Sequence, residues 1–362
     1  MVGLCRGSTV AGRNFEPLRS KTIEFTRLAF GDNMDETGSS TARVLGPKEF
    51  EAVMGERPIR QIALIGFGEA GGIFGSDLAA AGLSVSIFDI LLNGEPSRSA
   101  MLAKATAAKV RACDTLDEAL RGSDLIISAV TAASALDVAT AAAPFVRSGQ
   151  TYLDFNSVSP ESKREIARIL DGTPATFVEA AVMAPVAPQR LKAPILLGGA
   201  GAAAAAPQLT AIGMNVKPVS DRVGVASAIK MCRSIIIKGL EAITVESMFT
   251  ARRYGAEKQV LESLQATYPD MGWNGPLPDY LISRVAEHGK RRAAEMREAA
   301  QAVTDAGLDP LTALGTAERQ DWLAQVIAEF SLAVPKGEKF SWQELADAIA
   351  EAMSLRGKSA GM

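Results

Sequence analysis

The segment Gln61–Gly71, QIALIGFGEAG, decides the fold of this chain. Its apolar run, Ile62 to Ile65, is short and ends at a glycine, which is typical of a strand buried on both faces. The strand leads into a G-x-G-x-x-G pattern that opens a predicted helix, Gly66-Phe67-Gly68-Glu69-Ala70-Gly71. The first glycine permits the tight turn, the second lets the backbone approach a pyrophosphate, and the third lets the helix pack closely on the sheet. The free N–H groups at the start of that helix are suited to bind the phosphates.

An acidic residue stands where a dinucleotide-binding loop of this kind needs one. The predicted strand Ser84–Asp89 ends in Asp89, 18 residues after Gly71, close to the expected spacing. We expect its carboxylate to accept hydrogen bonds from the adenosine ribose and to repel a 2′-phosphate by roughly 3 kcal/mol at about 5 Å. This favours NAD over NADP, although Arg98 or another nearby cation could soften the preference. Val130 and Thr131, where a later strand ends, complete the predicted cofactor site; the alternative is a tight strand-to-helix turn that holds no ligand.

The first half of the chain repeats the order strand then helix. Further strands are predicted near Val110 and over residues 124–130, 151–155, 176–182 and 195–198. This alternation predicts a doubly wound parallel α/β sheet of the Rossmann type. Past about Asp221 the strand signals stop, and the pattern predicts an all-helical C-terminal domain. The predicted organisation is a flexible N-terminal extension over residues 1–57, a NAD-binding Rossmann domain over 58–220, a helical substrate and dimerisation domain over 221–356, and a tail over 357–362.

Composition and charge exclude several classes of function. The net charge of −3 over 362 residues gives no electrostatic reason to expect nucleic acid as a partner. The three cysteines are far apart and His288 is the single histidine, so neither a disulfide framework nor a metal site is predicted. No segment approaches the roughly 20 apolar residues that span a bilayer, and the N-terminus lacks a secretory signal. We therefore expect a cytoplasmic protein without a membrane partner; Met54 is a second candidate start, which leaves open whether residues 1–53 are native.

Lys230 lies in a stretch, Ala226–Val245, that is helical in composition and apolar on nearly every side. A helix of that kind is usually buried, and a buried lysine must be paired or line a cavity. Burial lowers the pKa of an ammonium group toward neutral pH, where a lysine can act as acid and base. The alternative is a lysine whose charged end reaches solvent at a domain edge.

Four segments carry a resemblance to a known family. They are Gly66–Gly71, the segment Asp154–Pro160, the segment Val178–Pro185 and the glycine-led stretch Gly224–Ser234. In this order they resemble the motifs of the β-hydroxyacid dehydrogenase superfamily, and two later segments, Lys238–Ala242 and His288–Met296, are similar to its 6-phosphogluconate-dehydrogenase-like branch. The resemblance implies a nicotinamide-dependent oxidoreductase in which Lys230 exchanges a proton with the substrate oxygen as hydride is transferred. It also implies a homodimer or larger homo-oligomer built on the helical half.

Three places in the chain are expected to contact the substrate. Asn156 and Ser157 stand in the substrate-loop segment, where they can hydrogen-bond a carboxylate or hydroxyl, or else serve turn chemistry before the next helix. Arg233 and Ser234 replace the asparagine that many family members carry after the lysine, and Arg233 could clamp a carboxylate. In the helical domain, Arg292 is the candidate anion clamp; the alternative is a solvated face.

Ile237 argues against one substrate. The family's 6-phosphogluconate dehydrogenases carry a glutamate acid seven residues after the lysine, and here that position is Ile237. The predicted function is therefore an NAD(P)-dependent dehydrogenase of a small, anionic hydroxy acid or related polar alcohol, with the substrate and the physiological direction left open. Two alternatives remain: an imine or keto-acid reductase, and a dinucleotide-binding sensor without turnover.

Overall fold

The computed structural model describes residues 58–359. The predicted flexible extension, residues 1–57, lies outside the described residues, as do residues 360–362 of the predicted tail. The tail prediction was wrong for Gly357 to Ser359, which continue the last helix.

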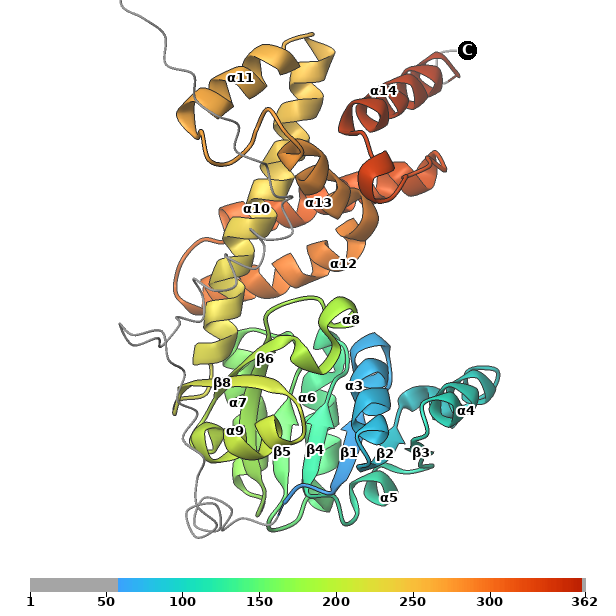
Figure 1. Cartoon of the computed structure of the whole chain (residues 1–362), viewed down its shortest axis with the longest axis vertical. Coiled ribbons are helices and arrows are strands. Elements are labelled where there is room, and N and C mark those ends of the chain that lie inside the picture. The colour runs from blue at the N-terminus through green and yellow to red at the C-terminus, as the bar shows by residue number, and fades with distance from the viewer. Residues whose placement is uncertain (1–57, 360–362) are drawn as a thin grey trace, which may run out of the picture. The chain divides into compact units, whose positions relative to one another are not determined.

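Eight strands form a single sheet in the order β3-β2-β1-β4-β5-β6-β7-β8 (Figure 1). Neighbouring strands are parallel except for the antiparallel pair β6 and β7. The strand order reverses between β1 and β4, and at such a switch point the carboxyl ends of the strands leave room for a ligand. The strands are β1 Gln61–Ile65, β2 Ser84–Phe88, β3 Arg111–Ala112, β4 Leu125–Ser128, β5 Thr151–Asp154, β6 Thr176–Val182, β7 Pro194–Gly198 and β8 Asn215–Ser220.

Strand β8 was not predicted from the sequence. It lies at the edge of the sheet and is largely exposed or half-buried, so its residues do not form an apolar run. Lys217 and Pro218 interrupt the pattern further, and proline is tolerated in a strand mainly at such an edge.

Helices cover both faces of the sheet. On one face, α3 (Glu69–Ala80), α4 (Ser97–Ala107) and α9 (Ala202–Ala211) share a core with Leu64 and Ile127. On the other face, α5 (Leu116–Leu120), α6 (Ala135–Ala142) and α7 (Pro160–Asp171) share a core with Ala63 and Ile126. Successive strand residues point to opposite faces, so each central strand contributes to both cores. A short helix, α8 (Val186–Gln189), follows β6.

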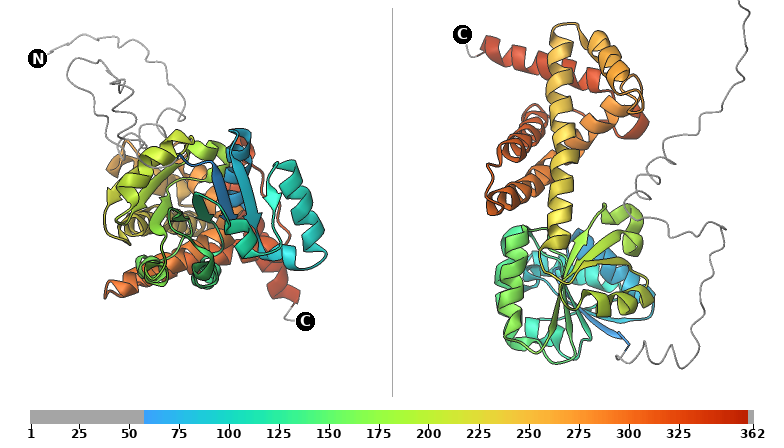
Figure 2. Two further views of the ribbon diagram at one scale, coloured as in Figure 1. Left: turned by 90° about the horizontal axis from the view of Figure 1, so that it is seen from below. Right: turned by 90° about the vertical axis from the view of Figure 1, so that its left-hand side faces the viewer.

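The rest of the described chain is helical, which confirms the predicted fold class (Figure 2). The longest helices, α10 and α12, have 29 residues each. Helices α12 and α13 cross closely at Gly289, where a Cβ would lie 2.6 Å from the carbonyl oxygen of Gln320. The helices are α10 Val225–Arg253, α11 Glu257–Thr267, α12 Leu277–Asp305, α13 Leu311–Glu329 and α14 Trp342–Ser359.

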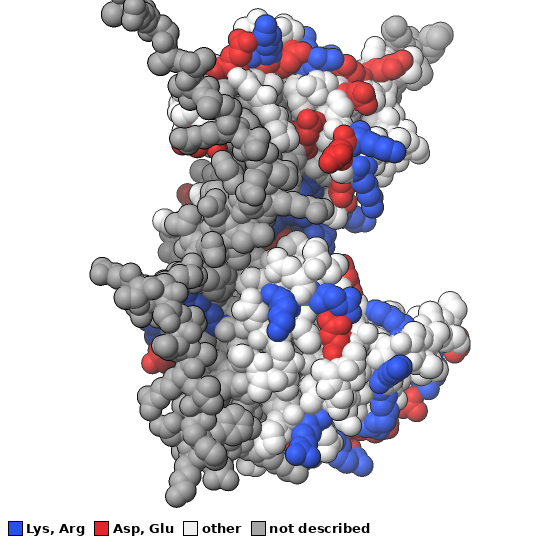
Figure 3. All heavy atoms as spheres, in the orientation of Figure 1, with Lys and Arg blue, Asp and Glu red and all other residues white. Residues whose placement is uncertain are grey.

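The surface charges are mixed in sign. On the face drawn in Figure 3, acidic and basic side chains are interspersed over the helical part, in line with the small net charge of the chain. Within residues 58–359, none of the helices combines the length and the apolar character needed to cross a membrane.

Candidate active site

The glycine loop between β1 and α3 has the shape that a bound phosphate requires. Gly66 has a φ of +91°, and a Cβ there would lie 2.4 Å from the carbonyl oxygen of Ala129. A Cβ on Gly71 would lie 2.2 Å from the carbonyl oxygen of Gly66, so the first and third glycines are needed for packing. A Cβ on Gly68, by contrast, would meet no described atom within 4 Å, and no described side chain caps the start of α3. The N–H groups of this helix end therefore face an open cradle that fits a dinucleotide.

Asp89 lies against this loop, as the sequence predicts. Its carboxylate accepts hydrogen bonds from the N–H of Phe67 at 2.7 Å and from the N–H of Leu91 at 3.0 Å. A carboxylate has about four acceptor positions, so two remain for other donors. Val130 also lies at the loop, because its Cγ1 would be 2.9 Å from a Cβ on Gly66. Thr131 bonds Ser134 through its hydroxyl, at 2.9 Å.

Asn156, predicted to bind substrate, has protein partners in the structure. Its side chain is buried, and both ends of the amide have partners: Oδ1 accepts from the N–H of Val130 at 2.7 Å, and Nδ2 donates to Oγ of Ser128 at 2.9 Å. A buried amide needs such partners, so we assign Asn156 to anchoring the loops after β4 and β5 rather than to binding substrate. Ser157 follows it and is half-buried.

Sequence reasoning missed contacts of polar groups at the end of β5 and around the start of α7. Asp154 and Lys163 form a buried ion pair, with Lys163 Nζ 3.0 Å from a carboxylate oxygen of Asp154 and donating to its backbone carbonyl at 2.8 Å. Ser159 begins α7 and reaches α12, where its hydroxyl donates to Asp305 at 2.9 Å and its N–H donates to Glu298 at 3.2 Å. These bonds join the predicted substrate loop to the helical part of the chain.

Glu179 fixes the start of α10 to the sheet. This buried residue of β6 accepts hydrogen bonds from the N–H groups of Gly224 and Ser227, the latter at 2.7 Å. A carboxylate at a helix N-terminus also interacts favourably with the helix dipole. Gly224 has a φ of +99°, which glycine adopts without strain. Because Lys230 lies in the second turn of α10, Glu179 fixes the helix segment that carries it.

Polar residues of α10 line up on one face of an otherwise apolar helix. They are spaced three or four residues apart, so they share a side of the helix. Lys230 is half-buried, and the other members are buried. We call this set the polar seam; it consists of Ser227, Lys230, Ser234, Lys238 and Glu241.

The middle of the polar seam is paired with α12. Lys238 Nζ lies 3.0 Å from a carboxylate oxygen of Glu295 and donates to the hydroxyl of Ser234 at 3.1 Å. Glu295 also pairs with Arg291. Although burial opposes it, Lys238 and Arg291 hold the pKa of Glu295 below its ordinary value. Burial lowers the pKa of Lys238 in turn.

Lys230 has the perturbed proton affinity expected of an acid–base group. Burial lowers its pKa from the ordinary 10.5 to about 8, against the opposing effect of the negative Glu295. Three further cations lower the pKa in addition, namely Lys163, Lys238 and Arg291. At neutral pH the amine is therefore mostly protonated, with a useful neutral fraction.

Of the two arginines predicted to clamp a substrate anion, one is buried and the other is exposed. Arg292 is buried, and its Nε and Nη2 both bond the carboxylate of Glu241, Nε at 2.7 Å. A buried guanidinium needs an anion, and this pair joins α12 to α10. Contact between Arg292 and the substrate stays a prediction. Arg233 is exposed, so the structure brings Ser234 but not Arg233 into the polar seam.

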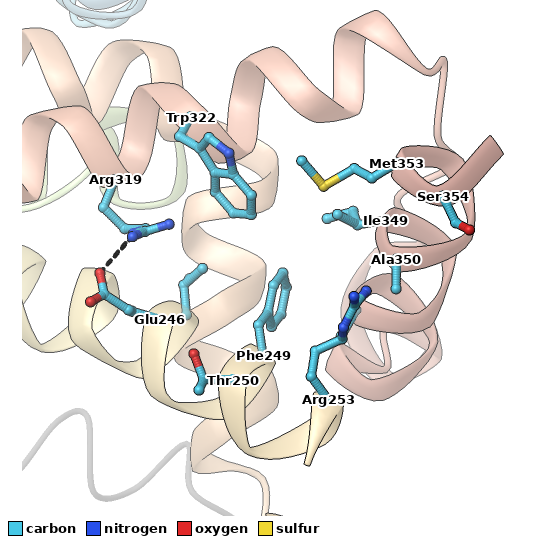
Figure 4. Close-up of a pocket in the computed structure, with 12 residues that line it drawn as sticks. Glu246, Phe249, Thr250, Arg253, Arg319, Trp322, Ile349, Ala350, Met353 and Ser354 are labelled. Carbon is cyan, nitrogen blue, oxygen red and sulfur yellow. Dashed lines mark hydrogen bonds and ion pairs between the residues drawn. The ribbon is translucent and has the colours of Figure 1, made fainter. Parts of the chain in front are cut away.

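A separate hollow of about 590 Å³ lies between α10, α13 and α14 (Figure 4). Phe249, Trp322 and Ile349 form its apolar wall, and Arg319 at its edge pairs with Glu246. Its nearest lining residue on α10 is Val245, 15 residues beyond Lys230, or about 22 Å along the helix axis. The hollow is thus distinct from the polar seam around Lys230.

Comparison with known proteins agrees with this arrangement. Residues 61–220 match a family model described as the NAD binding domain of 6-phosphogluconate dehydrogenase, and residues 251–323 match one described as a domain of unknown function, DUF1932. The crystal structure of a conserved hypothetical protein from Sinorhizobium meliloti 1021 is 33% identical, covers 80% of this chain and 97% of its own, and has a TM-score of 0.69.

Two curated proteins are similar in sequence. An uncharacterized 28.5 kDa protein of Methanothermus fervidus is 29% identical over 254 residues, which is 69% of this chain and 94% of that protein. The 3-hydroxyisobutyrate dehydrogenase of Pseudomonas aeruginosa is 23% identical over 247 residues, which is 65% of this chain and 80% of that enzyme.

Proposed function

The chain belongs to the β-hydroxyacid dehydrogenase superfamily, in its 6-phosphogluconate-dehydrogenase-like branch, and on this premise we propose that it transfers hydride between a nicotinamide dinucleotide and a small anionic hydroxy acid. One observation carries the proposal. Lys230, with its pKa lowered to about 8, stands on a helix that Glu179 fixes to the same sheet whose glycine loop forms an open phosphate cradle.

The residues of the chain supply proton transfer and position. When bound, the nicotinamide supplies the hydride acceptor or donor. In the oxidative direction, the neutral amine of Lys230 accepts the proton of the substrate hydroxyl; in the reductive direction, its ammonium form returns that proton to the carbonyl oxygen. A pKa of about 8 keeps both forms of Lys230 populated near neutral pH, as both directions require.

The charges around Lys230 favour an anionic substrate. Five cations lie at the seam or act on Lys230, namely Lys163, Lys230, Lys238, Arg291 and Arg292. Four carboxylates face them: Glu241 and Glu295 in the seam, Glu179 at Ser227 and Asp154 at Lys163. Five positive and four negative charges leave an excess of one positive charge when all are ionised. Partly buried charges are weakly screened, so this excess attracts a carboxylate or phosphate group.

The function can be tested with a panel of 3-hydroxy acids, including 3-hydroxyisobutyrate, assayed with NAD and with NADP by the absorbance of the reduced cofactor. We expect turnover of at least one hydroxy acid. We also expect no decarboxylation of 6-phosphogluconate, because Ile237 stands where those enzymes carry their glutamate acid. Binding of a dinucleotide without turnover across the panel and its keto-acid counterparts would favour the sensor alternative.

The pH dependence of oxidation should report the pKa of Lys230. Because the neutral amine is the base, the oxidative rate should rise with pH through about 8 and then level off. Glu295 raises this pKa, so the Glu295→Gln variant should move the rising limb to lower pH. The measurement is the pH profile of kcat/KM, which reports the pKa of the unliganded protein, for the substrate found in the panel.

Glu246→Gln is a matched control for this experiment. Glu246 is also a charged carboxylate that forms an ion pair, and it lies on α10. It is largely exposed, however, and pairs with Arg319 at the hollow of Figure 4. Its pH profile should equal that of the unmodified protein. A profile of Glu295→Gln that did not move, or moved to higher pH, would argue against Lys230 as the titrating base.

The helical half exposes an apolar stripe that a second copy of the chain could cover. Ile229, Ile236 and Ile243 follow one another at seven-residue spacing on α10 and are 41%, 73% and 61% exposed. At about 100° per residue, this stripe lies on the face of α10 opposite the polar seam. An apolar residue at every seventh position keeps one side of a helix apolar, as at one core position of helices that pair. We propose that this stripe is part of a homodimer interface.

Sedimentation at micromolar concentration tests the proposed dimer. We expect the unmodified chain to sediment as a dimer or larger assembly, and Ile236→Glu to weaken it because a charge would be buried in an apolar contact. Leu308→Glu, at another exposed apolar residue, serves as control and should not dissociate the assembly. A monomeric unmodified chain would count against the interface.

A further inference from the structure

A lysine from a neighbouring helix sits directly on the glycine loop. Lys104 of α4 donates hydrogen bonds through Nζ to the carbonyl oxygens of Phe67 and Gly68, the latter at 2.6 Å. The ammonium lies 4.9 Å from the centre of the Phe67 ring, a cation–π distance. It also fills the space beside Gly72, where a Cβ would be 2.9 Å from Nζ.

This ammonium and the carboxylate of Asp89 bond the backbone of the same residue, Phe67. The N–H of Phe67 donates to the carboxylate of Asp89 at 2.7 Å, and the carbonyl of the same residue accepts from Lys104. A positive and a negative side chain therefore flank one residue of the loop. Lys104 contacts carbonyl oxygens, whereas the pyrophosphate of a dinucleotide is bound by N–H groups at the start of α3. Lys104 and Asp89 therefore meet at one residue of the loop, next to the position where a Rossmann fold holds the adenosine ribose.

The other cation near Asp89 is already engaged. Arg98, which the sequence suggested as a group that could soften the preference for NAD, bonds the carbonyl oxygen of Leu92 and the carboxylate of Asp114, both at 2.7 Å. Among the described residues, Lys104 donates to the carbonyl oxygens of Phe67 and Gly68, and neutral carbonyls leave its positive charge uncompensated. Lys104 is an exposed residue, so its side chain can turn from these carbonyl oxygens to a phosphate, exchanging neutral partners for a charged one.

We propose that Lys104 is a cofactor-selectivity residue that contacts the 2′-phosphate of NADP and so limits the preference for NAD set by Asp89. The inference rests on the proposed dinucleotide binding and adds a named residue to it. The two side chains act in opposite directions, because a 2′-phosphate is repelled by the carboxylate and attracted by the ammonium.

Direct titration of NAD and of NADP into the protein, followed by calorimetry, tests this role without a substrate. We expect the unmodified chain to bind NAD more tightly than NADP. Lys104→Met should weaken NADP about tenfold, the size expected for one largely exposed charge-assisted contact, and change NAD less than about threefold. Lys104→Arg, which keeps the charge, should retain most of the affinity for NADP. Asp89→Asn should act in the opposite sense and narrow the gap between the two dinucleotides.

Lys192→Met is the matched control, because Lys192 also donates to a backbone carbonyl, that of Gly213 at 3.0 Å, but away from the glycine loop. It should leave both affinities unchanged. An equal loss for NAD and NADP in Lys104→Met would overturn the inference and leave Lys104 as a support of the loop, and unchanged affinities for both would overturn it as well. If the unmodified chain bound neither dinucleotide, both the inference and the proposed function would be wrong.

Discussion

Replacing Lys230 by alanine is expected to lower turnover about 10²- to 10⁴-fold, the usual contribution of a positioned acid–base group. Dinucleotide affinity should stay nearly unchanged, because the glycine loop binds the phosphates with backbone groups of α3. Lys230→Arg should be almost as inactive, since a guanidinium stays protonated at working pH and cannot act as a base. The measurements are kcat for the substrate found in the panel and calorimetric affinity for the dinucleotide.

Lys290→Ala provides the control for loss of a positive charge. Lys290 is an exposed residue of α12, and its removal should leave kcat within about twofold, as for an ordinary surface substitution. A Lys230→Ala variant with near-normal kcat and normal dinucleotide affinity would contradict the proposed mechanism. The proton would then have to be assigned to Lys238, the other lysine of the polar seam, which Glu295 and Ser234 hold in place.

The first strands of the sheet and the glycine loop could be predicted from the sequence because both depend on local patterns. The apolar run before Gly66 and the glycine spacing depend on residues that are neighbours in the chain, and β1, α3 and β2 lie where these patterns predict. Strand β8 could not be found in this way. Its residues are largely exposed at the sheet edge, so the pairing that makes it a strand, with β7, leaves no apolar alternation in the sequence.

Only the spacing of the polar seam, and not its ion-pair partners, could be predicted from the sequence. The spacing of Ser227, Lys230, Ser234 and Lys238 is a helical pattern that could have been noticed within an apolar segment. Its partners could not, because the pairs of Lys238 with Glu295 and of Glu241 with Arg292 join positions more than 50 residues apart.

The partners of Asn156 and Arg292 could not be predicted from the sequence for the same reason. Asn156 and Arg292 have side chains that suit a substrate anion, and sequence reasoning proposed them for that reason. The structure gives both of them buried protein partners, Val130 and Ser128 for one and Glu241 for the other. Whether a polar side chain faces a ligand or satisfies a neighbour depends on tertiary contacts, which a single sequence does not contain.

Removing the charge partner of Arg292 should be the most destabilising of the proposed changes. The side chains of Arg292 and Glu241 are only 9% and 2% exposed, and their paired bonds join α12 to α10. Glu241→Ala would leave a guanidinium buried without an anion, which costs about 3–5 kcal/mol. We expect urea unfolding to give a free energy of unfolding lower by that amount with an unchanged slope.

The exposed pair of Arg319 and Glu246 is the matched comparison, since it also joins α10 to a neighbouring helix, α13. Glu246→Ala should cost no more than about 1 kcal/mol, because surface ion pairs contribute little. The double variant Glu241→Leu with Arg292→Met should recover much of the loss, since apolar side chains of similar size can replace a buried pair at little cost. A Glu241→Ala variant as stable as Glu246→Ala would show that water reaches Arg292, and the buried pair would then not be what holds α12 on α10. If instead Glu241→Ala is destabilised and the double variant recovers, the loss comes from the uncompensated charge on Arg292 and not from the missing glutamate side chain.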